Sequence, residues 1–170
     1  MPMAWVNART LKRRTVLLPG LFGLAALAAL AGSREAAAQP ACTGPESPVR
    51  LYVNVENVRA GQGLIAVTLY ADDSSKFLAR RGALYVGRVP ARTPATRVCI
   101  HLPSTGTYAI AVYHDADSNR SFNRTGLGLP EEGFGFSNNP GTLFGLPSFR
   151  SVRLAVPRSD MQTTVRIRYP

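Results

Sequence analysis

Motifs that mark the common enzyme classes are missing from this chain of 170 residues. It has no nucleophile elbow, no zinc-protease helix, no phosphate-binding loop and no dinucleotide fingerprint. Only two cysteines and two histidines are present, and no CxxC pair occurs. These absences argue against a zinc or reactive-thiol site. We therefore assign no catalytic residue and no certain cofactor from the sequence.

Long hydrophobic runs are also scarce, since the sequence contains one, from Thr15 to Gly32. It follows the basic cluster Lys12-Arg13-Arg14 and precedes small residues that end at Ala38. This order is typical of a secretory signal peptide, whereas a membrane-spanning helix would need about 20 uninterrupted apolar residues. We expect residues 1–38 to be cleaved, which leaves residues 39–170 as one periplasmic or secreted domain without a transmembrane anchor.

Acidic residues are few, with ten against twenty Lys and Arg. Five of these bases and one acid lie in residues 1–38, so residues 39–170 carry a net charge of +6. Their bases are dispersed and nearly all are arginine. A dispersed basic surface does not predict nucleic-acid binding. It suggests an unidentified envelope ligand or protein as partner.

The two cysteines, Cys42 and Cys99, predict a disulfide, because exported domains with an even number of cysteines usually pair them. This bridge would close a loop of nearly sixty residues. On the chain-entropy model such a loop contributes about 4 kcal/mol to stability.

Apolar and polar residues alternate with a period of two from Val49 onward. The segments with this pattern are 49–55, 63–70, 83–89, 96–102, 107–115, 150–156 and 163–169. Short strands with turn residues between them predict an all-β fold, an antiparallel β-sandwich of seven or eight strands. The junction HLPSTGTYAI is similar to a turn of transthyretin-like and immunoglobulin-like sandwiches. We expect 96–102 and 107–115 to be neighbours, and we expect no helix beyond one helical turn at 75–81.

A long connection, residues 114–148, separates the fifth and sixth of these strands. Loops of this length are usually functional or disordered. Its many Phe and Leu residues argue for order. We expect a cap that folds over one end of the sandwich.

Oxygen-bearing side chains alternate at the start of this loop, as they do in calcium-binding loops. The candidate metal ligands are Asp115, Asp117, Asn119, Asn123, Glu131 and Glu132. Arg120 occupies the sixth position, where calcium loops have Gly, so we expect weak binding. The alternative interpretation is a metal-free network of Asx turns.

A second set of residues is a candidate ligand surface: His101, His114, Phe134, Phe136 and Asn138. The two Phe rings either plug the open end of the sandwich or line a binding site. We favour a non-enzymatic module that binds a ligand or partner. The alternative is a small hydrolase that uses the loop from His114 to Glu132.

The stretch YAIAVYHDADSNRSFNRTGLGLPEEGFGFSNNP, followed by GLPSF at 145–149, resembles a family signature. The pattern YHDxDxN…GxPxEGFGFSNN is similar to that of a secreted bacterial domain-of-unknown-function (DUF) family, number two-one-four-one. The resemblance covers residues 49–169 and implies export and a β-sandwich, with no established activity. Commoner members have Gly at the position of Arg120 and Asp at that of Asn123, which implies weaker calcium binding here.

Overall fold

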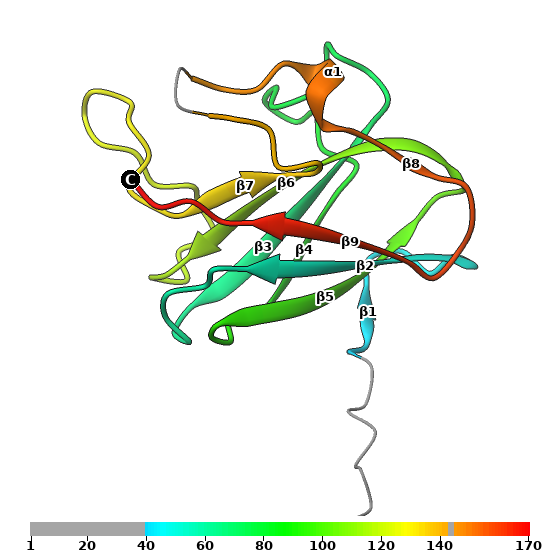
Figure 1. Ribbon diagram of the computed structural model, residues 1–170, viewed down its shortest axis with the longest axis horizontal. Coiled ribbons are helices and arrows are strands. Elements are labelled where there is room, and N and C mark those ends of the chain that lie inside the picture. Colours follow the sequence, from blue (N-terminus) through cyan, green and yellow to red (C-terminus); the bar gives the residue numbers. More distant parts are fainter. Residues whose placement is uncertain (1–39, 143–144) are drawn as a thin grey trace, which may run out of the picture. The chain divides into compact units, whose positions relative to one another are not determined.

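Two β-sheets form the domain in the computed structural model, which describes residues 40–142 and 145–170. The predicted signal segment, residues 1–38, lies outside the described residues. One sheet has the strand order β1-β5-β2-β9, and the other has the order β4-β3-β6-β7 with β8 also paired to β6 (Figure 1). The strands are β1 (Cys42–Thr43), β2 (Val49–Glu56), β3 (Leu64–Ala71), β4 (Tyr85–Pro90), β5 (Ala95–Leu102), β6 (Gly106–Asp115), β7 (Phe134–Phe136), β8 (Arg153–Val156) and β9 (Met161–Arg166).

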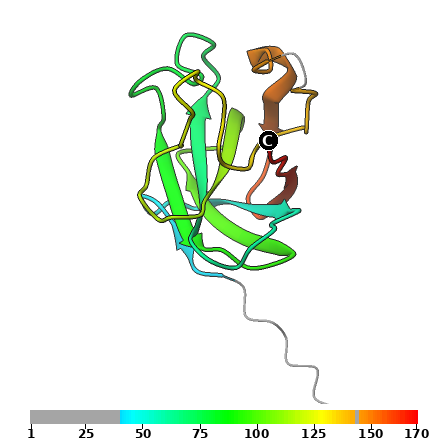
Figure 2. The same ribbon diagram turned by 90° about the vertical axis from the view of Figure 1, so that its left-hand side faces the viewer.

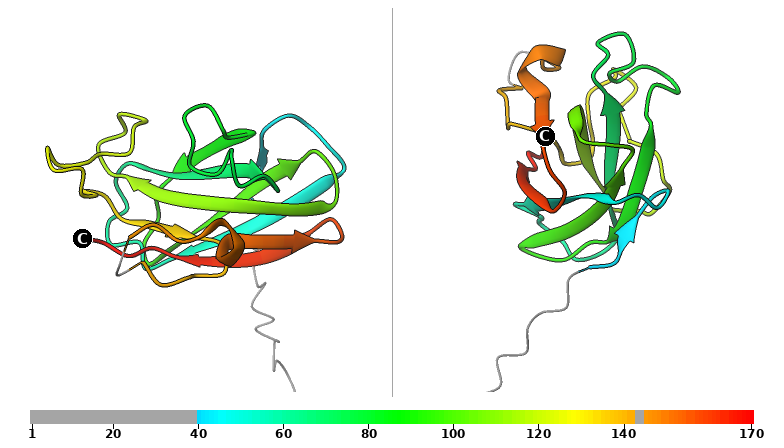
Figure 3. Two further views of the ribbon diagram at one scale, coloured as in Figure 1. Left: turned by 90° about the horizontal axis from the view of Figure 1, so that it is seen from above. Right: turned by 90° about the vertical axis from the view of Figure 1, so that its right-hand side faces the viewer.

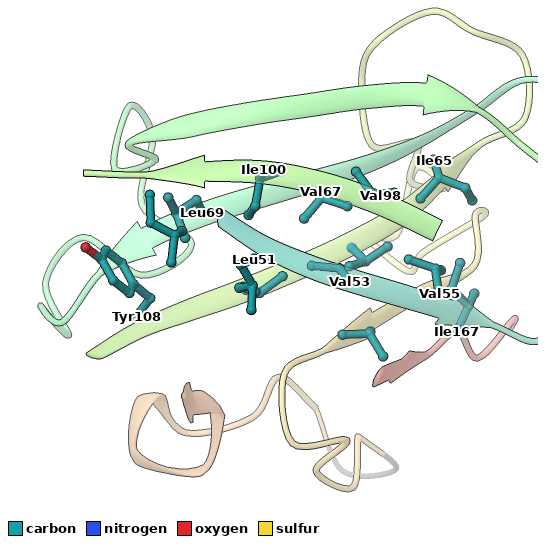
Figure 4. Close-up of a cluster of buried hydrophobic side chains, with 14 of the residues drawn as sticks. Leu51, Val53, Val55, Ile65, Val67, Leu69, Val98, Ile100, Tyr108 and Ile167 are labelled. Carbon is teal, nitrogen blue, oxygen red and sulfur yellow. The ribbon is translucent and has the colours of Figure 1, made fainter. Parts of the chain in front are cut away.

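The core lies between the two sheets, where the alternating apolar residues meet. Leu51, Val53 and Val55 of β2 are fully buried. They lie beside buried side chains of β5 in the same sheet and face those of β3 in the other sheet (Figure 4). Each such side chain contributes about 1.5–3 kcal/mol when it leaves water. The predicted all-β sandwich is confirmed.

Strand β6 organises the second sheet and ends at the candidate site. It pairs along its length with β3, while its other edge is shared by β8 and then β7. The predicted loop is therefore wrong in one detail, because residues 134–136 form β7. This strand has only three residues, Phe-Gly-Phe, which is too short for a period of two to be recognised.

Two other predictions about the strands are corrected. The segment predicted as a strand over 150–156 begins with a helical turn, α1 (Phe149–Val152), and only β8 is extended. Strands β5 and β6 are in different sheets, not neighbours. The connection between them crosses the sandwich, and Tyr108 fixes it because its hydroxyl donates to Ser104 O, 2.8 Å away.

The predicted disulfide is present between Cys42 and Cys99. It joins β1 to β5, which run parallel with these two residues in register. Within the described ranges, no helix has the length and apolar character needed to cross a membrane.

The connection from β6 to β7, residues 116–133, is named here the β6–β7 loop. It extends past the ends of the strands (Figure 3, left) and faces the viewer in Figure 2, in yellow. The C-terminal segment lies at the base of this loop, where Phe134 forms a bridge with Arg168. This end of the sandwich holds the candidate site.

Candidate metal centre in the β6–β7 loop

The last two residues of β6 point to opposite faces of the sheet, because side chains alternate along a strand. His114 follows the core residues Ile110 and Val112 and is 2 % exposed. Asp115 follows Ala109 and Ala111, which lie on the outer face, and is 0 % exposed. A fully buried carboxylate is costly unless its charge is compensated.

Glu132 lies beside Asp115 because of the pairing between β6 and β7. Ala111 pairs with Phe136 and Tyr113 pairs with Phe134. The hydrogen bond from His114 N to Gly133 O extends this register by one residue. The next residues in the register are Asp115 and Glu132, which therefore share the outer face.

Asp117 completes a group that we call the carboxylate cluster, Asp115, Asp117 and Glu132. One carboxylate oxygen from each residue lies within 4.8 Å of the other two. Glu132 is 7 % exposed, whereas Asp117 is exposed. At this separation, two buried like charges repel by about 3 kcal/mol at an effective dielectric constant of about 20. The cluster thus brings together charges that need a counter-charge.

Backbone and amide groups of the loop satisfy part of this need. Asp117 accepts bonds from Asn119 N at 3.1 Å, from Asn119 Nδ2 at 2.8 Å and from Asn123 Nδ2 at 3.0 Å. Arg120 N donates to Asp115 Oδ2 at 3.0 Å, and Asn123 N donates to Glu132 Oε2 at 3.0 Å. The loop is thus wrapped around the three carboxylates.

The other oxygens of the two buried carboxylates remain without protein donors. In the part of the chain that the structure describes, neither Asp115 Oδ1 nor Glu132 Oε1 has a hydrogen-bond partner. Buried polar atoms are almost always paired, so two orphaned oxygens in one cluster need an explanation. A bound cation would supply it.

The loop conformation depends on close backbone approach and on left-handed residues. A Cβ atom on Gly63 would lie 2.2 Å from Asp115 O, so the neighbouring loop packs directly against the start of the β6–β7 loop. Arg120 adopts φ 63°, the left-handed conformation that Gly takes at the sixth position of a calcium loop. The chain therefore keeps the turn without the glycine.

The pKa values of Asp117 and Glu132 are shifted in opposite directions. The hydrogen bond from the backbone of Asn119 lowers the pKa of Asp117, with help from the amide of Asn123. Burial raises the pKa of Glu132, and the hydrogen bond from Asn123 N only partly opposes this shift. A cation beside Glu132 would therefore favour its charged form.

Three of the six proposed metal ligands form the cluster, and the others have different positions. Asn119 and Asn123 turn their amide nitrogens to Asp117, and Asn119 Oδ1 accepts from Ser121 N at 2.7 Å. This is the expected Asx-turn network. Glu131 is exposed, and its backbone N–H bonds to Asn123 O. The sequence could not separate Glu131 from Glu132, because the register with β6 decides between them.

The candidate ligand residues lie in separate places. His101 is on β5, where its Nδ1 contacts Ser47 O at 3.0 Å. Phe134 and Phe136 lie on the outer face of the β6 sheet with Phe77 and Phe149. Asn138 donates to Ser151 O and Arg153 O, so it ties the end of β7 to α1 and β8.

His114 has both ring nitrogens occupied. Nδ1 contacts the hydroxyl of Tyr169 at 2.8 Å, and Nε2 contacts Gln62 O at 2.8 Å. The carbonyl accepts, so Nε2 carries the proton and Nδ1 accepts from the tyrosine. A buried imidazole with these partners is a structural element at the end of the core, and it points away from the carboxylate cluster.

A protein-family model described as "Uncharacterized protein conserved in bacteria (DUF2141)" matches residues 53–165. The match runs from the middle of β2 through most of β9 and includes the whole β6–β7 loop. No curated protein and no solved structure matches the chain.

Proposed function

This chain belongs to the bacterial DUF2141 family, and we propose that it is an exported, non-enzymatic binding module whose β6–β7 loop is held by a divalent cation. The observation that carries the proposal is the pair of orphaned oxygens, Asp115 Oδ1 and Glu132 Oε1. Both belong to residues more than nine-tenths buried, and both residues belong to the carboxylate cluster.

Calcium is the cation that this donor set fits best. All three side chains offer hard oxygen ligands, and calcium takes six to eight oxygens from carboxylates, carbonyls and water in variable geometry. Magnesium requires near-ideal octahedral geometry and usually keeps several waters. Two of the carboxylates are buried and held by backbone hydrogen bonds. They therefore have little freedom to move into the octahedral geometry that magnesium requires.

The affinity should be low, in the range of about 10⁻⁴ to 10⁻³ M that is typical of extracellular modules. Arg120 adds strain and positive charge to the loop, and Asn123 offers an amide where a carboxylate would bind more tightly. Export supports the proposal, since calcium would be available outside the cytoplasm. The predicted signal segment and the disulfide both favour export.

Thermal melts in chelator and in calcium test this function. At ten times its dissociation constant, calcium should stabilise the parent protein by about 1.4 kcal/mol. For a domain of this size, that corresponds to about 5 °C. Asp117→Ala should show little of this gain, and magnesium should give less than calcium. A parent protein whose melting temperature is the same in chelator and in saturating calcium would show that the carboxylates only build turns.

A further inference from the structure

A pocket of about 320 Å³ lies on the outer face of the β6 sheet, next to the carboxylate cluster. Its floor comes from β3, β6 and β7, and the β6–β7 loop supplies one wall. The residues that define it best are Tyr70, Ala111, Tyr113, Phe122, Phe134 and Phe136. Its volume is at the small end of the range for ligand-binding pockets, about 300–1,000 Å³. We call it the outer pocket.

The aromatic rings of the outer pocket form a connected series. The ring centroid of Phe122 lies 5.5 Å from Tyr113 and 5.7 Å from Phe134, and Phe134 lies 5.9 Å from Phe136. All three contacts are edge-to-face, which fixes the rings and leaves part of their surface accessible. Tyr113, Phe122 and Phe134 are each half-buried. This surface is suited to a flat or extended apolar group.

Apolar side chains also surround the opening of the outer pocket. Leu146 and Leu78 line it, and they are 59 % and 36 % exposed, respectively. The outer face of an antiparallel sheet in a sandwich is normally polar where it meets water. Exposed leucines beside a ring-lined hollow are instead characteristic of a binding site.

Arg124 is the charged residue among those that line the pocket. Its guanidinium lies 4.9 Å from the ring centroid of Phe122, and its Nη1 donates to Gly128 O at 3.0 Å. Among the described residues, its other N–H groups have no hydrogen-bond partner and no carboxylate pairs with it. A guanidinium held at the edge of an apolar pocket can bind a carboxylate through two parallel hydrogen bonds.

From this juxtaposition we infer that the outer pocket binds a small hydrophobic carboxylate. The apolar body would lie on the rings of Tyr113, Phe122 and Phe134, and the carboxylate would bind Arg124. This inference goes beyond the cation site and does not depend on it. The two sites share a wall, however, because Asn123 bonds to the carboxylate cluster while Phe122 and Arg124 line the pocket.

Calorimetric titration with paired ligands tests the inference. The aromatic pair is 2-naphthoate and its neutral analogue 2-naphthalenemethanol, and the acyl pair is decanoate and decanol. We expect saturable binding with one ligand per chain, and about tenfold preference for the carboxylate in at least one pair, as a charge-assisted bond predicts. The pair with the stronger preference identifies the apolar body. Absence of saturable binding, or equal affinity for acid and alcohol in both pairs, would overturn the inference.

Two variants locate the binding. Arg124→Gln should abolish the preference for the carboxylate and leave the alcohol unaffected, whereas Arg158→Gln, at an exposed arginine on the β8–β9 connection, should retain it. Ala111→Leu should weaken both members of the pair by filling the pocket. Each titration is run in chelator and in calcium. Binding of the carboxylate in either condition supports the proposed pocket. A protein that binds no calcium can therefore still show that the pocket binds its ligand. An unchanged preference in Arg124→Gln would contradict the assignment.

Discussion

At the scale of single residues, the site depends on the difference between two adjacent glutamates. Glu132 is buried beside Asp115, while Glu131 points to solvent. The sequence shows two equivalent acids here, and no local pattern separates them. The distinction arises from the register of β7 on β6, which is a long-range contact.

Replacement of Glu132 by Gln removes the buried charge. Burial raises the pKa of Glu132. A carboxyl group whose pKa is higher in the folded state favours folding while it is protonated. This contribution is fully present below the unfolded-state pKa and is lost as the pH rises through the folded-state pKa. In chelator at neutral pH, Glu132→Gln should therefore melt higher than the parent, and the gap should close as the pH falls toward about 4. Melting curves from neutral to acidic pH measure this.

The matched control is Glu131→Gln, which should melt like the parent at every pH and keep the full gain from calcium. Glu132→Gln should lose that gain. If both variants respond to calcium as the parent does, Glu132 is not a ligand.

Arg120 carries the second residue-scale prediction. Its left-handed conformation, φ 63°, costs a residue with a Cβ atom roughly 1–2 kcal/mol. Glycine avoids this strain. Its greater conformational freedom in the unfolded chain, however, lowers the free energy of unfolding by about 0.5–1 kcal/mol. Arg120→Gly should therefore stabilise the protein by about 0.5–1 kcal/mol and tighten calcium binding severalfold. Urea unfolding and calcium titration measure the two effects. Arg120→Gln separates them, since it removes only the charge and should tighten calcium binding without stabilisation.

At the scale of elements, the sequence predicted the long strands well and the short ones poorly. The alternation of apolar residues locates β2, β3, β5 and β6 to within about two residues, because each buries one face for its whole length. β7 has three residues, and it pairs with residues of β6 that are more than twenty positions earlier in the sequence. No local pattern reveals such a pairing. The helical turn α1 likewise depends on Ser137 and Asn138, which bond to its carbonyls and to β8.

Gly135 in β7 explains why glycine alternates with phenylalanine in this segment. A Cβ atom at Gly135 would lie 2.6 Å from Arg166 O and 2.9 Å from Val165 Cγ1. Gly135→Ala should therefore destabilise the protein by about 1–3 kcal/mol, as overpacking does. It should also reduce the gain from calcium, because β7 holds Glu132 beside Asp115.

Gly141→Ala serves as the control, since among the described residues, its two chain neighbours apart, no heavy atom lies within 4 Å of a Cβ placed there. Its stability should stay within about 0.5 kcal/mol of the parent. Equal midpoints for the two variants in urea unfolding would show that β7 does not pack closely on β9.

At the scale of the whole molecule, the disulfide and the carboxylate cluster lie at different places in the fold. Cys42–Cys99 ties the edge strand β1 to β5 across a sequence separation of 57 residues. On the chain-entropy model this bridge stabilises the fold by about 4 kcal/mol. The double variant Cys42→Ala/Cys99→Ala should lower the free energy of unfolding by a similar amount and leave calcium affinity unchanged. A loss of calcium affinity in a variant that remains folded would contradict this independence.

The central claim is that a cation binds the carboxylate cluster, and anomalous X-ray scattering from crystals grown in millimolar calcium tests it most directly. We predict a peak between Asp115, Asp117 and Glu132, with carboxylate oxygens about 2.3–2.6 Å away. Crystals of Glu132→Gln under the same conditions should lack it. An anomalous map without a peak at this position, or with its strongest peak at another acidic group, would contradict the account.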